Sequence, residues 1–227
     1  MSGPPKIPHP ATYQGMSFAK VVDDIPKDAS VDSLKAFLPS ILNALYFTPA
    51  GHKSQIDAGV EGLRRQPHVL TAIESVYAGV TRERTDFRLL LISLYGELRR
   101  KDGIDFLQEI AWQPLPPQET SDYLTPREKE ESIQAKAVQS LAYLRSETAD
   151  SLVLNVVSTH PSRLVRIAAI DAFVWNHPAD PASLKRLLEK VKPGEEAYVG
   201  MQHFHRAINV DEFNQGLRQW RKNTEPK

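Results

Sequence analysis

The stretch that decides the fold is SRLVRIAAIDAF, residues 162–173. Its apolar residues recur at steps of three and four, which is the spacing of one face of an α-helix. Ser162 follows directly on His160-Pro161 and is of the type that caps a helix N-terminus. No Val- and Ile-rich alternating segment of the chain is long enough for a convincing strand. The sequence therefore predicts an all-α protein.

The pattern of residues 162–173 also occurs earlier in the chain, at two fixed offsets. A shift of 32 residues places Val138 on Ile170, and a shift of 46 residues places Ile92 on Val138. Each shift also aligns the helix that follows, so the repeating unit is a helix pair, and stacked pairs share a core that one pair cannot form alone. The aligned positions are Ile92, Tyr95 and Leu98 with Val138, Leu141 and Leu144; Phe106 and Ile110 with Leu152 and Val156; Ala137, Val138 and Leu141 with Ala169, Ile170 and Phe173; and Leu152 and Val156 with Leu184 and Leu188.

Residues 162–173 resemble the first helix of a HEAT repeat, in which an apolar residue and Arg precede Ala, an aliphatic residue and a large apolar residue. The matching residues are Val165-Arg166, Ala169-Ile170 and Phe173. The resemblance covers residues 86–192 well and 53–80 weakly. It implies a right-handed α-solenoid of HEAT-like helix pairs whose second helices line the concave face.

The Arg of this pattern is not present in every unit. Arg88 occupies the position of Arg166 in the earlier unit, whereas Gln134 replaces it in the middle one. The chain therefore departs from an unbroken ladder of Arg residues between repeats.

The sequence predicts a tail followed by one domain. Residues 1–17, with four prolines in the first ten residues and no apolar period, predict a flexible or surface-lying tail. Residues 18–227 are predicted to form a single HEAT-like repeat domain, interrupted by a proline-rich insert at 113–125. Pro39 predicts a kink or two short helices in the N-terminal region, and Thr125 with Glu128 predicts a capping box. The expected helices are Ser30–Phe47, Lys53–Arg64, Pro67–Val80, Asp86–Arg100, Gly103–Trp112, Thr125–Arg145, Ala149–Thr159, Arg163–Asn176, Ala182–Lys192 and a C-terminal capping helix Asp211–Lys222, with residues 195–209 ambiguous.

Composition excludes several classes of protein. The chain carries 28 Lys and Arg against 28 Asp and Glu, which argues against a protein whose main work is to grip nucleic acid phosphates. Without Cys there is no disulfide, thiolate zinc site or cysteine nucleophile. No apolar run approaches the roughly 18 residues of a membrane span, and the first residues lack the pattern of a signal peptide. A cytoplasmic location is favoured, and a secreted or periplasmic one stays open if a signal peptide was removed.

No residue pattern predicts catalysis, a metal or a cofactor. His203 and His205 would point about 200° apart on a helix, and no third ligand stands at an evident spacing. Phosphate-loop, dinucleotide-binding and nucleophile-elbow motifs are absent. A cluster of cations is interpreted as helix capping, with a phosphate-contacting groove as the alternative. Its members are Arg64, Arg65, Arg82, Arg84, Arg88, Arg99, Arg100 and Lys101.

The insert 113–125 is the best candidate for an interaction surface, since long loops in compact domains are often functional. It carries Leu115, Tyr123 and Leu124 among prolines. Two interpretations stay open. The loop either presents these side chains to a partner, or crosses the surface and buries Tyr123 and Leu124 in the core. Trp175, near the end of its helix, is expected in the core.

The sequence thus predicts a non-catalytic scaffold that binds another protein or a peptide, with its oligomeric state open. The predicted contact residues on the second helices are Asp105, Gln108, Glu109, Asn155, Lys185, Arg186 and Glu189, and those in the insert are Leu115 and Tyr123. The alternative is an enzyme, either a base-excision protein similar to helical-repeat DNA glycosylases or a lyase-like repeat subunit that acts on a bound chromophore. Nucleic acid is otherwise a disfavoured partner.

Overall fold

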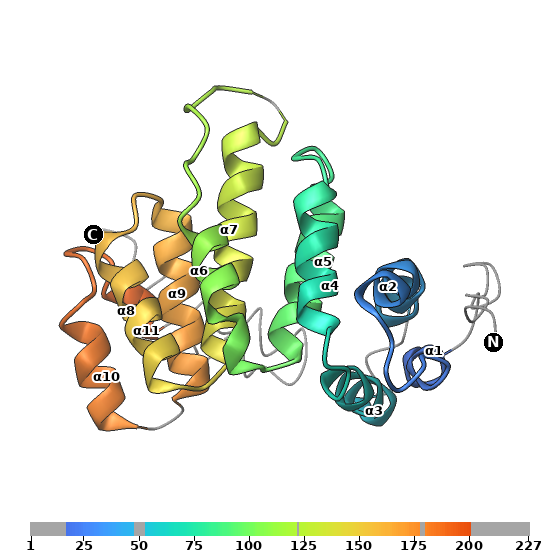
Figure 1. The fold of residues 1–227 in the computed structure, drawn as a ribbon. Helices are drawn as coiled ribbons and strands as arrows, with labels where there is room; N and C mark the ends of the chain where they lie inside the picture. The colour runs from blue at the N-terminus through green and yellow to red at the C-terminus, as the bar shows by residue number, and fades with distance from the viewer. Residues whose placement is uncertain (1–16, 48–52, 122, 178–179, 201–227) are drawn as a thin grey trace, which may run out of the picture. The chain divides into compact units, whose positions relative to one another are not determined.

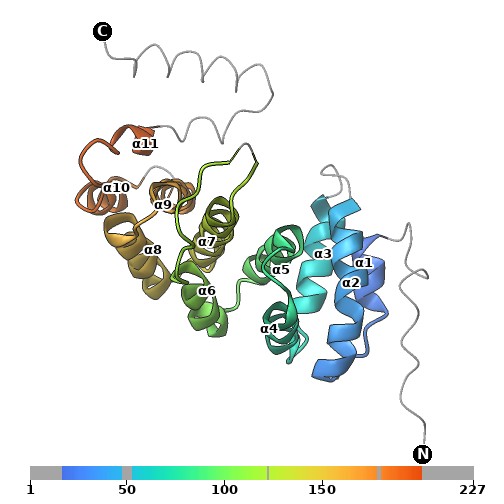
Figure 2. The ribbon, with the colours of Figure 1, turned by 90° about the horizontal axis from the view of Figure 1, so that it is seen from above.

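The computed structural model describes residues 17–47, 53–121, 123–177 and 180–200. Within these residues all regular secondary structure is helical, which confirms the all-α prediction (Figures 1 and 2). The chain divides into two compact units, residues 1–106 and residues 107–227, which we call unit 1 and unit 2. A single repeat domain over 18–227 stays a prediction.

Most helices lie where the sequence predicts them. The first ones are α1 (Phe18–Asp23), α2 (Val31–Phe47), α3 (Lys53–Arg64), α4 (Val69–Gly79), α5 (Thr85–Glu97) and the 3₁₀ turn Lys101–Gly103, which leads into α6 (Ile104–Ala111). They are followed by α7 (Pro126–Tyr143), α8 (Glu147–Thr159), α9 (Arg163–Asn176), α10 (Pro181–Leu188) and α11 (Ala197–Gly200). The bounds of α3 and α9 agree with the prediction. The largest difference is at the end of α10, which stops at Leu188 and not at Lys192.

Some predicted features lie outside the described residues. These are the tail up to residue 16, the pair His203 and His205, and the C-terminal helix Asp211–Lys222. Only the start of the ambiguous stretch 195–209 is described, and it contains the short helix α11.

Pro39 lies within one continuous helix, α2, so the prediction of two short helices is wrong. The kink stays a prediction. A proline in a helix leaves the carbonyl group four residues earlier, here that of Lys35, without its N–H partner. Pro39 is exposed, so the free carbonyl lies on the side where water reaches the helix. Buried residues on the opposite side, such as Leu34, Leu38 and Ile41, hold the helix in place.

In unit 1, two glycines of α3 allow α1 to pack closely against it. Phe18, Val21 and Val22 of α1 are buried. A Cβ atom on Gly59 would lie 2.5 Å from Cδ1 of Phe18, and one on Gly62 would lie 2.7 Å from Cγ1 of Val22. No side chain larger than hydrogen fits at these two positions without displacing α1.

A second buried cluster in unit 1 combines aromatic rings with polar groups. The Phe106 ring contacts Tyr77 edge-on, with 5.4 Å between ring centroids, and Tyr95 at 4.8 Å. The Tyr95 hydroxyl donates to Oε1 of Glu74 at 2.6 Å. Burial and this carboxylate raise the pKa of Tyr95 well above its usual range, so the phenol stays a donor. The cluster gives each buried hydroxyl group a partner, as buried polar groups require.

In unit 2, α9 packs against α7, α8, α10 and α11, and Figures 1 and 2 both show α7, α8 and α9 side by side. The buried positions of α7 return in α9 after a shift of 32 residues, as the sequence alignment predicts. The matched buried pairs are Gln134 and Arg166, Ala137 and Ala169, Val138 and Ile170, Ser140 and Ala172, Leu141 and Phe173, and Ala142 and Val174. The two helices therefore use the same sides for packing.

The shift of 46 residues relates α5 to α7 in the same way. The buried positions of α5 that it aligns with those of α7 are Arg88, Leu91, Ile92, Leu94, Tyr95 and Gly96. The helix ends match too, because Arg99 and Arg145 both adopt positive φ, 51° and 48°. Their N–H groups donate to the carbonyls of Gly96 and Ala142, at 3.1 and 3.2 Å. Burial and backbone conformation thus follow the offset found in the sequence.

The alignment does not extend to the side of α10 that packs. It places Leu184 and Leu188 on Leu152 and Val156, but both leucines of α10 are exposed, by 40% and 46%. The residues of α10 that are buried are Ser183 and Leu187. A difference of one residue turns a helix by about 100°, so it exchanges the packed side for the exposed one.

Replacing Gly59 by alanine tests the close packing of α1 on α3. Gly59→Ala should destabilise the protein by about 1–3 kcal/mol, because the new methyl group overlaps the Phe18 ring. Gly79→Ala is the matched control, since a Cβ atom there meets no atom within 4 Å. It should leave stability unchanged or raise it by up to about 1 kcal/mol. Urea denaturation measures both variants, and equal losses would contradict the packing.

Candidate functional site

The insert 113–125 is fixed to unit 2 at its beginning. Nε2 of Gln134 on α7 donates to the carbonyl oxygen of Gln113 at 2.6 Å. The Trp112 ring lies against the His160 ring, with 5.1 Å between centroids. Two side chains from distant parts of the chain therefore determine where the insert leaves α6.

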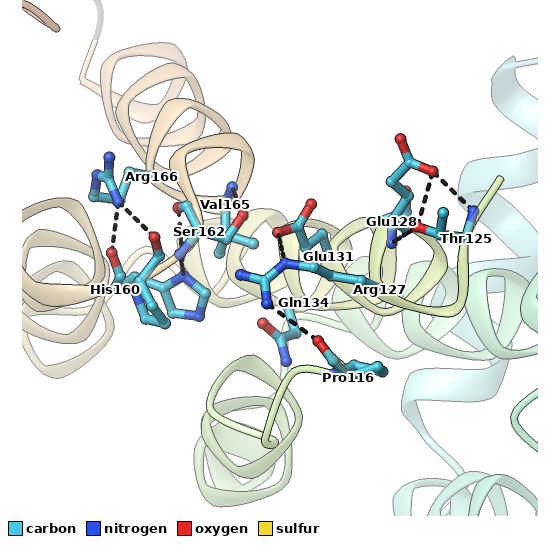
Figure 3. A network of polar contacts seen from close by, with 12 residues as sticks. Pro116, Thr125, Arg127, Glu128, Glu131, Gln134, His160, Ser162, Val165 and Arg166 are labelled. Carbon is cyan, nitrogen blue, oxygen red and sulfur yellow. Dashed lines mark hydrogen bonds and ion pairs between the residues drawn. The ribbon is translucent and has the colours of Figure 1, made fainter. Parts of the chain in front are cut away.

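The middle and the end of the insert are fixed as well, as Figure 3 shows. Nη1 of Arg127 donates to the Pro116 carbonyl oxygen at 3.1 Å, and Nε of the same residue pairs with Oε1 of Glu131 at 3.2 Å. Thr125 and Glu128 form the predicted capping box, which is confirmed. The hydrogen bonds to Glu128 lower the pKa of its carboxyl group, so it is ionised in the box.

Between these fixed points the insert exposes two apolar side chains, Tyr123 by 85% and Leu124 by 69%. The interpretation in which they are buried in the core is wrong. A residue just before an N-cap often packs against an apolar residue at the fourth helical position. Here that position is Lys129, so Leu124 has no apolar partner on α7. Tyr123 and Leu124 thus stand in solvent on a rigid support.

His160 is buried where α8 ends and forms part of this support. Its Nδ1 accepts the N–H of Ser162 at 3.2 Å, and its ring also bonds the backbone of Ala111. Burial lowers the pKa of His160, and the charge of Arg166 adds to this effect, although the two hydrogen bonds oppose it. The ring is therefore a neutral connector between α6 and the turn before α9.

Arg166 connects the same turn to the segment before α11. Its Nη1 donates to the carbonyl oxygens of His160 at 2.7 Å and Pro161 at 3.1 Å. Its Nε and Nη2 pair with the two carboxylate oxygens of Glu195 at 3.1 and 2.5 Å. Both side chains are buried, and the hydrogen bonds from Arg166 lower the pKa of Glu195.

The position that Arg88, Gln134 and Arg166 share keeps one role where the residue type changes. Gln134 reaches a carbonyl group just after α6, as Arg166 reaches two just after α8. In unit 1, Arg88 donates to the Tyr77 hydroxyl, at 2.7 Å from Nη2. Each of the three side chains thus bonds a group on or just after the preceding helix.

The predicted contact residues are accessible but lie in different places. Asp105 belongs to unit 1, and the others belong to unit 2. Those exposed are Asp105, Glu109, Asn155, Lys185, Arg186, Glu189 and Tyr123, and those half-buried are Gln108 and Leu115. A concave face that would bring these residues together stays a prediction.

The cluster of cations in unit 1 is largely engaged in capping, as the first interpretation expects. Nε of Arg64 donates to the carbonyl of Leu98 at 2.7 Å, where α5 ends. Nη1 of Arg100 donates to the carbonyl of Gln66 at 3.1 Å, just after α3. Arg100 also pairs with Asp102, which lowers the pKa of that carboxyl group. The two arginines thus cap each other's neighbouring helix.

One group in unit 2 has the composition of a catalytic triad, and the sequence analysis did not find it. Nδ1 of His177 lies 3.4 Å from Oγ of Ser183, and its Nε2 lies 3.0 Å from Oδ2 of Asp150, though not at a hydrogen-bond angle. Ser183 is only 6% exposed, and its side chain bonds the N-cap residue Asp180. A nucleophile must reach its substrate, so this group is better explained as a cap of α10.

Trp175, which precedes this group, is 45% exposed. The prediction that it lies in the core is therefore wrong, because its side of α9 has no neighbour among the described residues.

The remaining site predictions were compared with the whole described part of the chain. It contains no group of three or more His, Asp or Glu side chains that could hold a metal ion. None of its helices is long and apolar enough to cross a membrane. No protein-family model, curated protein or solved structure matches the chain. The resemblance to HEAT repeats therefore stays a prediction.

The buried His160 predicts a loss of stability in mild acid. Its pKa in the folded protein is below the ordinary value of 6.5, so the unfolded chain binds the proton first. The contribution is complete above pH 6.5 and falls as the pH drops towards the lower, folded-state pKa. The loss should be at most about 1.4 kcal/mol per pH unit. His160→Asn keeps an acceptor for Ser162 and does not titrate, so denaturation at pH 7.5 and 5.5 should show a smaller loss for this variant. Equal losses would contradict the assignment.

A double-mutant cycle tests the buried pair of Arg166 and Glu195. Arg166→Met should cost about 3–5 kcal/mol, because it leaves the Glu195 carboxylate buried without a counter-charge. The variant with both Arg166→Met and Glu195→Met should cost clearly less than the sum of the single changes. Additive free energies of unfolding, from denaturant titration, would show that the pair is not coupled.

Proposed function

We propose that this protein is a non-catalytic scaffold that binds another protein or a peptide, and that the insert 113–125 is its main contact. The observation that carries the proposal is the exposure of Tyr123 and Leu124 on a loop that four sets of contacts hold in place. Large apolar side chains in fixed positions are the usual anchors of protein interfaces. A loop that is already ordered also loses less conformational entropy on binding.

The architecture that we propose for the scaffold is a right-handed solenoid of HEAT-like helix pairs. Two observations support it: the matching burial of α5, α7 and α9 at the offsets found in the sequence, and the related roles of Arg88, Gln134 and Arg166. In such a solenoid the exposed residues of the second helices, among them Glu109, Asn155 and Lys185, would add polar contacts to the apolar anchors of the insert.

The enzymatic alternatives have less support. A base-excision protein needs cations that are free to contact phosphates, whereas Arg64, Arg88 and Arg100 donate to carbonyl groups and to Tyr77. No specific observation favours the chromophore lyase.

A double substitution in the insert tests the proposal. Tyr123→Ser with Leu124→Ser should reduce retention of the partner by tenfold or more in affinity purification from the source cell, because two anchor side chains are lost. The thermal unfolding temperature should not change, since both side chains are exposed. Gln118→Ala with Glu119→Ala, in the same loop, is the matched control and should retain the partner. Equal retention by all three proteins, or no specific retention by the wild type, would contradict the proposal.

A further inference from the structure

Helix α10 is attached to unit 2 along one side only. Ser183 and Leu187 are its buried residues, and the rest of the helix is exposed. Asp180 caps its N-terminus, where the Ala182 N–H donates to Oδ1 of Asp180 at 3.0 Å. The helix is thus held firmly, but most of its circumference faces solvent.

The exposed circumference of α10 combines leucines with cations. Leu184 and Leu188 are one helical turn apart and are 40% and 46% exposed. Lys185 and Arg186 stand between them in the sequence, and Lys190 follows directly after the helix; all three are exposed. None of these three cations forms an ion pair with a carboxylate of the described residues. We call these five residues the α10 surface.

The charge of this segment differs from that of the chain. Residues 181–192 contain four Lys or Arg and one Glu, a net charge of +3, whereas the whole chain is neutral. Positive charge is therefore concentrated around the two exposed leucines. Such a surface attracts a partner of the opposite sign over a distance of about 10 Å at moderate salt.

We propose that the α10 surface docks an acidic amphipathic segment of a partner protein. The apolar side chains of that segment would cover Leu184 and Leu188, and its carboxylates would pair with Lys185, Arg186 and Lys190. This inference goes beyond the proposed function, because it assigns a second surface and gives the chemistry of what binds there. It does not depend on the insert.

Charge also decides against the other occupants. Two copies of this surface would bring like charges together across a two-fold axis. Within the chain itself, residues 1–16 contain no Asp or Glu, and the amphipathic stretch 211–222 has three Arg or Lys against two acidic residues. A membrane surface is a weaker fit, because the leucines are already half covered and α10 carries no aromatic residue to enter the lipid interface.

The test is a binding titration of the full chain with a designed probe. The probe is a fluorescein-labelled 16-residue peptide with leucines at helical spacing and glutamates at all other positions, and fluorescence anisotropy reports its binding. A second peptide with glutamine in place of glutamate measures the contribution of charge. We expect the acidic peptide to bind at least tenfold more tightly than the glutamine peptide in 50 mM NaCl, and the difference to shrink in 300 mM NaCl.

Two variants locate the binding. Leu184→Ser with Leu188→Ser removes the apolar part, and Lys185→Glu with Arg186→Glu reverses the charge. Each should weaken binding of the acidic peptide by tenfold or more, and circular dichroism should show that both remain folded. If the leucine variant unfolds, the charge variant alone decides. Arg82→Glu with Lys101→Glu reverses two exposed cations of unit 1 and is the matched control, which should bind as the wild type does.

Several results would overturn the proposal. They are equal binding of the two peptides, unchanged binding by both α10 variants, or no binding of the acidic peptide to the wild type. Binding only to vesicles of phosphatidylcholine and phosphatidylglycerol would identify a membrane surface instead. Concentration-dependent dimerisation that both α10 variants abolish would identify a second copy. The variant Tyr123→Ser with Leu124→Ser should bind the peptide normally, which separates this proposal from the function proposed for the insert.

Discussion

In unit 2, the guanidinium group of Arg166 joins parts of the chain that have no other polar link. The last carbonyl groups of a helix have no partner within the helix, and those of His160 and Pro161 point into a buried turn. Arg166 supplies donors to both and uses the rest of its fork for Glu195, 29 residues later. One side chain therefore closes the end of α8 and ties down the approach to α11. The turn in turn holds His160, and through it the place where the insert leaves α6.

The same kind of contact gives the insert its fixed shape. A proline-rich loop has few N–H groups for internal hydrogen bonds, so its carbonyl groups must find donors elsewhere. Gln134 and Arg127 of α7 provide them at Gln113 and Pro116. What remains exposed is the part without such donors, and it carries Tyr123 and Leu124. Order and exposure coincide in this loop because α7 holds its backbone and covers none of its apolar side chains.

The balanced charge of the chain conceals an uneven distribution. In unit 1 the arginines around α3 and α5 are engaged with carbonyl groups and carboxylates. In unit 2 the cations of α10 have no such partners among the described residues and surround two exposed leucines. A net charge of zero can thus arise from local pairs in one unit and an unpaired surface in the other. These two arrangements differ in what they attract.

Much of the fold could be predicted from sequence, whereas less of the candidate site could. The helices, the capping box at Thr125 and the cap at Ser162 depend on residues no more than four positions apart, so their signals are local. The offsets of 32 and 46 residues also predicted which residues of α5, α7 and α9 are buried. The sequence further indicated the insert as a likely place of contact only in the sense that prolines interrupt a helical pattern there; it left open whether Tyr123 is buried.

By itself, then, the sequence determined that the chain is helical, where most helices begin and end, and which sides of the repeated helices pack. Only the tertiary structure decided that Tyr123, Leu124 and Trp175 are exposed, and that Arg166 pairs with Glu195. It alone also decided that α10 packs through Leu187 and leaves Leu184 and Leu188 free. The physical reason is that helix formation is a local property, whereas burial depends on which distant segment lies against a side chain.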